Sequence, residues 1–237
     1  SGGGHNDGCD GDDCVGGRPK NPSPPYNYKA PFSPIDVIEE YTRPARMRIN
    51  SQVVTKPALS DLEIFNFSEV GKLEAFNTDG LRSLLQTMSH IPNMKEKTLR
   101  YPGHAKLIQS MIDDGLFNNK NFDKTINRLF EDWKLKEDEP EFTILDINIY
   151  SDSKNIHYHL YDETDDISKS SSMARTTGFT ATATINMLLN NLWSKKGVFP
   201  PELVGENERC IDFLLSYLSA RNVTMSPVSY THLTLPT

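Results

Sequence analysis

Cysteine, positive charge and long apolar runs are all scarce in this chain of 237 residues. Its three cysteines, Cys9, Cys14 and Cys210, are odd in number and widely spaced, which makes a poor disulfide framework and favours a reducing compartment. A net charge of −7 lacks the basic stripe that a nucleic-acid partner requires. No apolar run approaches the roughly 18 residues of a membrane helix, and no signal peptide opens the sequence. We therefore expect a soluble, cytoplasmic protein with no membrane or nucleic-acid partner.

The sequence also lacks a glycine fingerprint for a dinucleotide. No Gly-x-Gly-x-x-Gly follows a strand and opens a helix, which is the context that gives this motif its pyrophosphate-binding geometry. Gly2-Gly3-Gly4-His5 has no apolar strand before it and no helical pattern after it. This chain alone is therefore expected not to bind a nicotinamide dinucleotide tightly.

Both ends of the chain have compositions that predict little packing. Residues 1–14 are rich in glycine and aspartate, which predicts a disordered or non-native segment. Residues 6–13 carry the aspartates of a calcium loop, but they lack the glutamate that closes such a site, so no calcium site is predicted. Residues 225–237 show no sustained period and are interpreted as a non-native tail. The domain itself is expected to span residues 15–224.

Strands and helices interleave between these ends without internal repeats. Hydrophobic periods predict strands over 46–49, 52–56, 62–67, 72–76, 95–101, 141–150 and 155–162, and helices over 34–41, 80–87, 103–115, 123–133, 177–193 and 207–221. Ser33 and Pro34 have the form of a capped helix start. A change of phase at Ile144-Leu145 predicts a bulge. The fold class is α/β (α+β): one domain with helices packed on a mainly antiparallel central sheet of five or more strands.

A strand, a turn and a helix meet around Arg100. Pro102 and Gly103 break the strand, and strand ends that face helix starts are common ligand positions in α/β proteins. A guanidinium there can grip a carboxylate with two parallel hydrogen bonds, although an arginine that ties down loop carbonyls is an equally serious interpretation. His104 opens the following helix. It could hold a proton near a substrate amine, or it could be a surface histidine at a helix start.

A second strand-to-helix turn lies at residues 77–80. Thr78 or Asp79 could cap the helix, and the same backbone amides could receive a substrate carboxylate. We expect this turn and Arg100 to converge, so that the guanidinium points into a cleft shared with Thr78, Asp79 and Thr98. That arrangement would recognise a carboxylate.

Two histidines, His157 and His159, project to one side of a predicted strand. Such a pair can bind a metal ion, but no cysteine or carboxylate clearly joins it in the sequence. We interpret the pair as part of a half-buried sheet face, and no metal site is predicted.

Four sequence motifs follow one another along residues 15–201 of the chain. They are VGGRP at 15–19 with Tyr28-Lys29 and Phe32-Ser33-Pro34; LEAFNTDGL at 73–81; TLRYPG at 98–103; and SMARTTG at 172–178, which runs on to KGVFPP at 196–201. In this order they resemble the C-terminal, substrate-binding half of the saccharopine dehydrogenase family. The resemblance covers about Val15 to Val223. Its detail is closer to lysine 6-dehydrogenase and bacterial relatives than to fungal saccharopine reductases, which carry an arginine near the position of Thr78.

The resemblance implies an oxidoreductase acting on the CH–NH group of an amino-acid metabolite such as saccharopine, lysine or a related amine or imine. It implies that NAD or NADP is bound mainly by an N-terminal Rossmann domain, which this chain lacks, so that the chain alone is incomplete and inactive. It also implies a homodimer with contacts through the sheet. The candidate residues are His104 for catalysis; Thr78, Asp79, Thr98, Leu99 and Arg100 for the substrate; and Gly16, Gly17 and Lys29 for the cofactor. The alternative is a stand-alone small-molecule binding or dimerisation domain without catalysis.

Overall fold

The computed structural model describes residues 10–30, 33–136, 139–152 and 154–228, which form nine strands and seven helices. The strands are β1 (Asp10–Pro19), β2 (Ala45–Ile49), β3 (Gln52–Lys56), β4 (Glu63–Phe67), β5 (Gly71–Asn77), β6 (Asn93–Arg100), β7 (Glu141–Tyr150), β8 (Asn155–Glu163) and β9 (Met225–Val228). The helices are α1 (Pro34–Thr42), α2 (Leu84–Thr87), α3 (His104–Asp113), α4 (Phe122–Asp132), α5 (Ser172–Leu189), α6 (Pro201–Gly205) and α7 (Glu208–Ser219).

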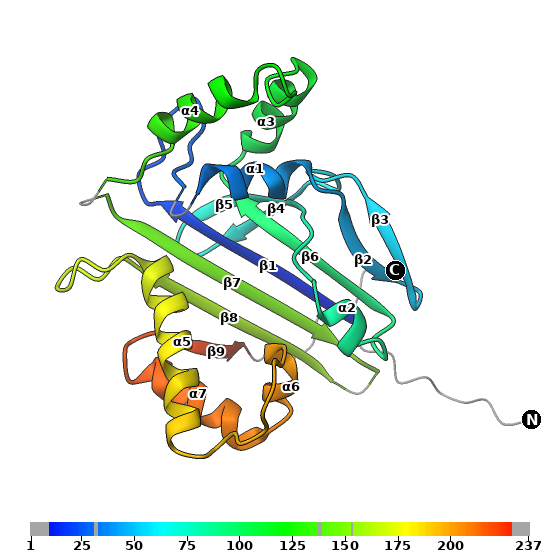
Figure 1. Cartoon of the computed structure of the whole chain (residues 1–237), viewed down its shortest axis with the longest axis vertical. Helices are drawn as coiled ribbons and strands as arrows, with labels where there is room; N and C mark the ends of the chain where they lie inside the picture. Colours follow the sequence, from blue (N-terminus) through cyan, green and yellow to red (C-terminus); the bar gives the residue numbers. More distant parts are fainter. Residues whose placement is uncertain (1–9, 31–32, 137–138, 153, 229–237) are drawn as a thin grey trace, which may run out of the picture.

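All nine strands belong to one sheet. The strand order is β3-β2-β6-β1-β7-β8-β9, and the β4–β5 hairpin joins through β5 to β6. β1 runs parallel to β6, and the other pairings between these strands are antiparallel. In Figure 1, α1, α3 and α4 gather at one end of the molecule and α5, α6 and α7 at the other, with β1 and β7 between them. The predicted fold class is confirmed. Among the described helices, none combines the length and the apolarity that crossing a bilayer requires.

The two ends of the domain extend further than the sequence predicted. Residues 10–15 of β1 pair with residues 93–98 of β6 and with residues 145–150 of β7. Residues 225–228 form β9 and pair with β8. The prediction of an unpacked segment through residue 14 is therefore wrong for residues 10–14, and the exclusion of the tail is wrong for residues 225–228. Strand pairing uses backbone groups, so a segment poor in apolar residues can still join a sheet. Residues 1–9 and 229–237 lie outside the described residues.

The β7–β8 pair contains no bulge at Ile144-Leu145, because its register is continuous from Phe142↔Glu163 to Tyr150↔Asn155. The change of phase has another cause. The first four residues of β7 are all buried, since both faces of the strand are covered there. A strand buried on both sides loses its alternation, and the sequence pattern then imitates a bulge.

Helix starts also differ from the sequence prediction. α5 begins at Ser172, five residues earlier than expected, and the Ser171 side chain accepts a hydrogen bond from the Ala174 amide. Pro34 takes the first position of α1 as predicted, but the Ser33 side chain makes no capping hydrogen bond. The helix predicted from residue 80 is confined to Leu84–Thr87.

Of the four apolar clusters among the described residues, two lie next to the strands and helices around Arg100. One joins α1, α3 and α4 and includes Val37, Tyr41, Ile108, Leu129 and Trp133. The other lies within the sheet and comprises Leu73, Ala75, Leu99, Phe142 and Ile144, each with no exposed surface. The second cluster ties β5, β6 and β7 together, and so fixes the strands that carry the candidate site.

Truncation of Leu73 should therefore destabilise the whole domain. We expect Leu73→Ala to lower the free energy of unfolding by about 2–5 kcal/mol, because it leaves a cavity in a closed cluster. Ile64 on the adjacent β4 is 57% exposed, so Ile64→Ala should cost less than about 1 kcal/mol. Urea unfolding followed by circular dichroism measures both. Equal losses in the two variants would contradict this description of the core.

Candidate functional site

Alternation along β6 places Glu96, Thr98 and Arg100 on one face of the sheet and Leu99 on the other. The Leu99 side chain is completely buried in the cluster with Leu73 and Phe142. The Leu99 side chain is therefore turned away from Thr98 and Arg100, because a strand turns neighbouring side chains to opposite faces, and the predicted role of Leu99 in substrate binding is left to its backbone. Its carbonyl does contribute, since it accepts a hydrogen bond from Arg100 Nη1 at 2.8 Å.

The Arg100 guanidinium is held rigidly between the sheet and α1. Only 3% of the residue is exposed. Nε donates to the Tyr41 hydroxyl at 2.6 Å, and the guanidinium carbon lies 4.6 Å from the centre of the Tyr28 ring. Nη2 faces the Glu40 carboxylate at 3.6 Å, which is too long for a hydrogen bond. Burial alone would lower the pKa of Arg100, but Tyr41, Tyr28 and Glu40 raise it, so the group remains a cation.

His104 completes a directed chain of hydrogen bonds that starts at this arginine. Its Nδ1 lies 2.9 Å from the Tyr26 carbonyl, and its Nε2 lies 3.0 Å from the Tyr41 hydroxyl. A carbonyl only accepts, so Nδ1 carries the proton, and Nε2 accepts from Tyr41, which in turn accepts from Arg100. Burial and then the charge of Arg100 lower the pKa of His104 to about 3. In this arrangement His104 is neutral and orients Tyr41, and its predicted catalytic role stays a prediction.

A second arginine increases the positive potential at this position. Arg18, in the VGGRP motif near the end of β1, is 1% exposed. Burial lowers its pKa, and the charge of Arg100 lowers it further. Two guanidinium groups that influence each other in a buried region make a favourable environment for an anion.

The turn at residues 77–80 was predicted to bind a carboxylate of the substrate. In the structure it binds the carboxylate of Glu96. Glu96 Oε2 accepts hydrogen bonds from the Thr78 hydroxyl at 2.6 Å and from the Gly80 amide at 3.0 Å. The hydroxyls of Thr78 and Thr98 lie 2.8 Å apart. These two predicted site residues are therefore brought together, with Glu96 as a third partner that the sequence analysis missed.

Asp79 does not cap a helix. Its carboxylate accepts from the Arg46 amide at 3.1 Å, from Nε at 2.9 Å and from Nη2 at 2.8 Å. Burial raises the pKa of Asp79, but these bonds from Arg46 outweigh burial and hold the pKa below its usual value. Arg100 and Asp79 thus have different charged partners, Glu40 and Arg46, and the cleft that they were predicted to share stays a prediction.

The start of α3 is occupied in the same way. Glu74 accepts from the Gly103 amide at 2.8 Å and from the Ala105 amide at 2.6 Å. Gly103 has a φ of 96°, a left-handed conformation that favours glycine over residues with a side chain. Both helix starts that were predicted to receive a substrate carboxylate therefore already hold a glutamate from the sheet.

The residues predicted to contact the cofactor are Gly16, Gly17 and Lys29, and their hydrogen bonds are made with other partners than those of Arg100. Gly16 and Gly17 are strand residues of β1, in register with Ile144 and Thr143. Lys29 donates from Nζ to the Asp132 carbonyl at 3.1 Å, which ties the loop before α1 to the end of α4. Next to Lys29, a cavity of about 610 Å³ is lined by Ala30, Trp133, Thr164 and Ser171 among others.

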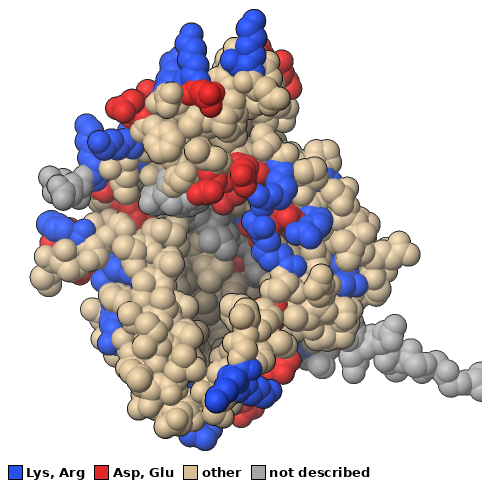
Figure 2. All heavy atoms as spheres, viewed as in Figure 1, with Lys and Arg blue, Asp and Glu red and all other residues tan. Residues whose placement is uncertain are grey.

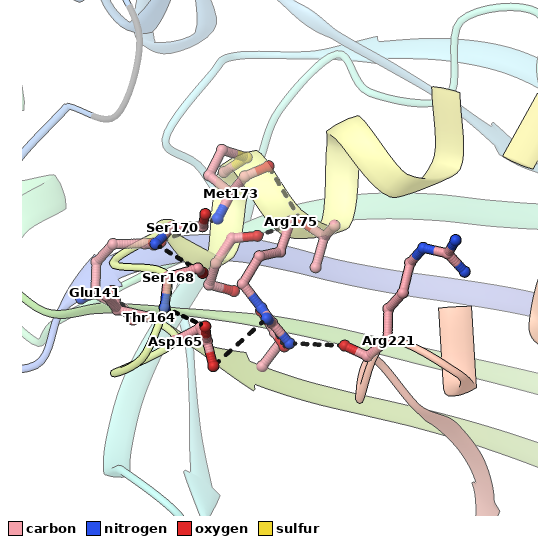
Figure 3. A network of polar contacts seen from close by, with 11 residues as sticks. Glu141, Thr164, Asp165, Ser168, Ser170, Met173, Arg175 and Arg221 are labelled. Carbon is pink, nitrogen blue, oxygen red and sulfur yellow. Dashed lines mark hydrogen bonds and ion pairs between the residues drawn. The ribbon is translucent and has the colours of Figure 1, made fainter. Parts of the chain in front are cut away.

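A buried polar network fixes the first turn of α5 beside this cavity (Figure 3). Arg175 reaches Asp162 from Nε at 3.3 Å and from Nη2 at 3.2 Å, and Nη2 also donates to the Arg221 carbonyl at 3.1 Å. Glu141 accepts from the Met173 amide at 3.0 Å, and burial raises the pKa of Glu141. These contacts join α5, β7, β8 and the end of α7. Arg175 belongs to the SMARTTG motif, but the motif alone did not predict this role for it.

Figure 2 shows this side of the molecule hollowed over the middle of the sheet, with acidic and basic side chains gathered along part of the rim. Arg100, Thr98 and Thr78 belong to the sheet face that carries α1. The chemistry available there is electrostatic: a fixed cation, two tyrosines and hydroxyl groups. That set can bind and orient an anionic group.

The pKa of His104 predicts how stability depends on pH. The pKa of His104 in the folded chain lies far below its value of about 6.5 in the unfolded chain. Below about pH 6.5 this histidine is therefore protonated in the unfolded chain and stays unprotonated in the folded chain. Stability from this group is complete above that pH and falls as the pH drops, by up to about 1.4 kcal/mol per pH unit. His104→Asn should flatten the slope between about pH 6.5 and pH 4.5, measured by urea unfolding. His90→Asn, at an exposed position, should leave the slope unchanged; identical slopes in all three proteins would contradict the prediction.

Comparison with known proteins agrees with this architecture. Residues 11–223 match the family profile of the saccharopine dehydrogenase C-terminal domain. The fold is similar to that of the apo form of histidine-tagged saccharopine dehydrogenase (L-Glu forming) from Saccharomyces cerevisiae, with a TM-score of 0.71. The similarity covers 93% of this chain and 67% of that chain at 12% sequence identity, so it concerns the fold alone. Since the family profile spans most of the sequence, this oxidoreductase-related chain belongs to the saccharopine dehydrogenase C-terminal domain family.

Proposed function

We propose that this chain is the substrate-binding part of an oxidoreductase that acts on the CH–NH group of an amino-acid metabolite, with NAD or NADP as the hydride carrier. Saccharopine, lysine and related amines or imines are the candidate substrates. Family membership supports the reaction class. The observation that carries the proposal is the buried, fully oriented Arg100 guanidinium beside α1. A homodimer and a cytoplasmic location belong to the proposal through the family resemblance alone.

Arg100 is prepared to receive a carboxylate at one nitrogen. Nε and Nη1 are committed to Tyr41 and to the Leu99 carbonyl, and these bonds fix the plane of the guanidinium. Nη2 faces Glu40, whose side chain is 36% exposed and lies 3.6 Å away. A substrate carboxylate that approaches Nη2 would displace Glu40 and form a shorter, charge-assisted hydrogen bond. Glu40 thus has the role of a replaceable counter-ion.

Hydride transfer depends on this kind of anchoring. The reacting carbon has to be held close to the nicotinamide, and fixing the substrate carboxylate supplies much of the required orientation. The rigid chain from Arg100 through Tyr41 to His104 reduces the reorganisation that binding would otherwise require. Thr78 and Thr98 offer hydroxyl groups on the same face of the sheet.

The nicotinamide cofactor, when bound, supplies or accepts the hydride, and a separate dinucleotide-binding domain would hold most of it. On α5, Thr177, Ala181 and Thr184 are exposed, and a Cβ atom at Gly178 would meet no other atom within 4 Å. We assign this small-residue face of α5 to contact with that domain. Lys29 and the Gly16-Gly17 pair stay predictions for the cofactor side.

Arg100 variants test the proposal in the parent polypeptide that includes the dinucleotide-binding domain. We expect Arg100→Ala to lower kcat/KM by about 2–4 kcal/mol in transition-state free energy, because the substrate carboxylate loses its charged partner. Arg100→Lys keeps the charge but loses the planar geometry, so an intermediate loss is expected. Reduction or oxidation of the nicotinamide, followed by absorbance with a panel of amino-acid amines and imines, is the measurement.

Arg43→Ala is the matched control, since Arg43 directly follows α1, has a side chain that is 36% exposed and pairs with Glu39 at 2.7 Å. It should leave kcat/KM within about 2-fold of the wild type, because exposed ion pairs contribute little. Melting temperatures exclude unfolding of the variants. Unchanged kcat/KM in a folded Arg100→Ala enzyme would remove Arg100 from the site. Tight binding of a substrate without any turnover would instead favour a binding module.

A further inference from the structure

A cluster of metal-ligand side chains lies on β7 and β8, on the sheet face opposite Thr98. His157 and His159 are two residues apart on β8 and so project to the same side. Asp146 on β7 lies directly opposite His159 in the antiparallel register. Asp146 therefore supplies the carboxylate whose apparent absence led the sequence analysis to predict no metal site.

The three side chains converge on one point. Asp146 Oδ1 lies 2.6 Å from His157 Nε2 and 3.0 Å from His159 Nδ1. One ligand atom from each residue lies within 4.8 Å of the other two. The side chains are shielded but accessible, with exposed fractions of 12% for Asp146, 13% for His157 and 19% for His159.

We propose that Asp146, His157 and His159 bind a divalent transition-metal ion of the Zn²⁺ class. Two imidazole nitrogens and one carboxylate oxygen are donors that suit Zn²⁺, Co²⁺ and Ni²⁺, whereas Ca²⁺ and Mg²⁺ take oxygen ligands. Three protein ligands leave a fourth tetrahedral position for water or for an external ligand. The site is separate from Arg100, because it lies on the other face of the sheet.

The spacing of the donors requires only a small adjustment. Bonds of about 2.0–2.1 Å to a tetrahedral ion place ligand atoms roughly 3.3–3.4 Å apart. The Asp146–His159 distance of 3.0 Å would open by a few tenths of an ångström, and the Asp146–His157 distance of 2.6 Å by somewhat more. Side-chain rotation can supply this movement.

A second set of contacts supports a metal site over a simple pair of hydrogen bonds. His159 Nε2 faces Glu69 Oε1 at 3.3 Å, on the side of the ring away from Asp146. Metal-binding histidines commonly donate their other N–H to a carboxylate, which fixes the tautomer that presents a lone pair to the metal. Asn148 Nδ2 donates to Asp146 Oδ2 at 3.0 Å and so orients the carboxylate. Two of the three ligands are thus already positioned by outer partners.

Metal titration of the full chain tests the proposal. After removal of metal with a chelator, Co²⁺ should bind in one equivalent and give the intense visible absorption of a low-coordinate site. Zn²⁺ should displace Co²⁺ and raise the melting temperature, since it binds the folded state. Affinity for Zn²⁺ is measured by competition with a chromogenic chelator. His157→Ala and Asp146→Asn should each lower it at least about 10-fold, and Glu69→Gln about 10-fold or less.

Control variants identify where the metal binds. The N-terminal segment also contains His5 and Cys9, so a His5→Ala, Cys9→Ser variant should keep the tight site, as should His90→Ala at an exposed position. Asp146→Asn preserves the shape of the side chain, and His157→Gln provides a second conservative change if His157→Ala unfolds. Equal affinity in the wild type and in folded Asp146→Asn and His157→Gln would overturn the proposal. Loss of binding only in the N-terminal variant would overturn it as well.

Discussion

Glutamates that project from the sheet anchor the segments packed against it. Glu74 on β5 accepts two amide hydrogen bonds at the start of α3, and Glu141 on β7 accepts one at the start of α5. Glu96 on β6 does the same for the turn after β5. The first amides of a helix have no partner within the helix and carry a partial positive charge, so a carboxylate there contributes both hydrogen bonds and favourable electrostatics. Glu74 and Glu141 thus hold the starts of α3 and α5, and Glu96 holds the turn after β5.

This anchoring determines which groups are left for a ligand. The turn at residues 77–80 and the start of α3 already hold carboxylates, so neither is open to a substrate anion. The cation that stays within reach of a ligand on that face is Arg100, with Arg18 near it and with the half-buried Glu40 as its counter-ion. Glu74 positions α3, and therefore positions His104 at its first residue, which orients Tyr41 against the guanidinium. Recognition through Arg100 thus depends on a glutamate that does not contact it.

Local periodicity predicted much of the architecture, because strands and helices with one buried face leave a clear pattern. The β7–β8 hairpin, the strand that ends at Arg100 and the helix after Gly103 were all found in this way. Features that depend on contacts between residues far apart in the sequence were not predicted. Neither the incorporation of residues 10–14 into β1 nor the burial of His104 has a local signal, since both depend on strands and helices that arrive from elsewhere in the chain.

The residues of the candidate site also divide into those that local motifs predicted and those that depend on distant contacts. The motifs identified Arg100, Thr78 and Thr98 as neighbours of one sheet face, and the last two are in contact. The partners of Arg100 and Asp79 could not be predicted, because Tyr41, Glu40 and Arg46 come from α1 and β2, which the motifs do not include. A carboxylate opposite His159 was equally invisible without the register of β7 and β8.

That register is constrained from both faces of the sheet. Glu141 and Asp146 are five residues apart on β7, and an odd separation in a regular strand places them on opposite faces. Glu141 thereby reaches α5, while Asp146 reaches His157 and His159. A bulge at Ile144-Leu145 would place two residues opposite one on the partner strand, which shifts the alternation by one and turns both carboxylates to the same face. Either the start of α5 or the histidine pair would then lose its carboxylate. The continuous register of β7 is therefore required by contacts on both sides, and it is the reason that one strand can serve the anchoring of a helix and a metal-ligand cluster together.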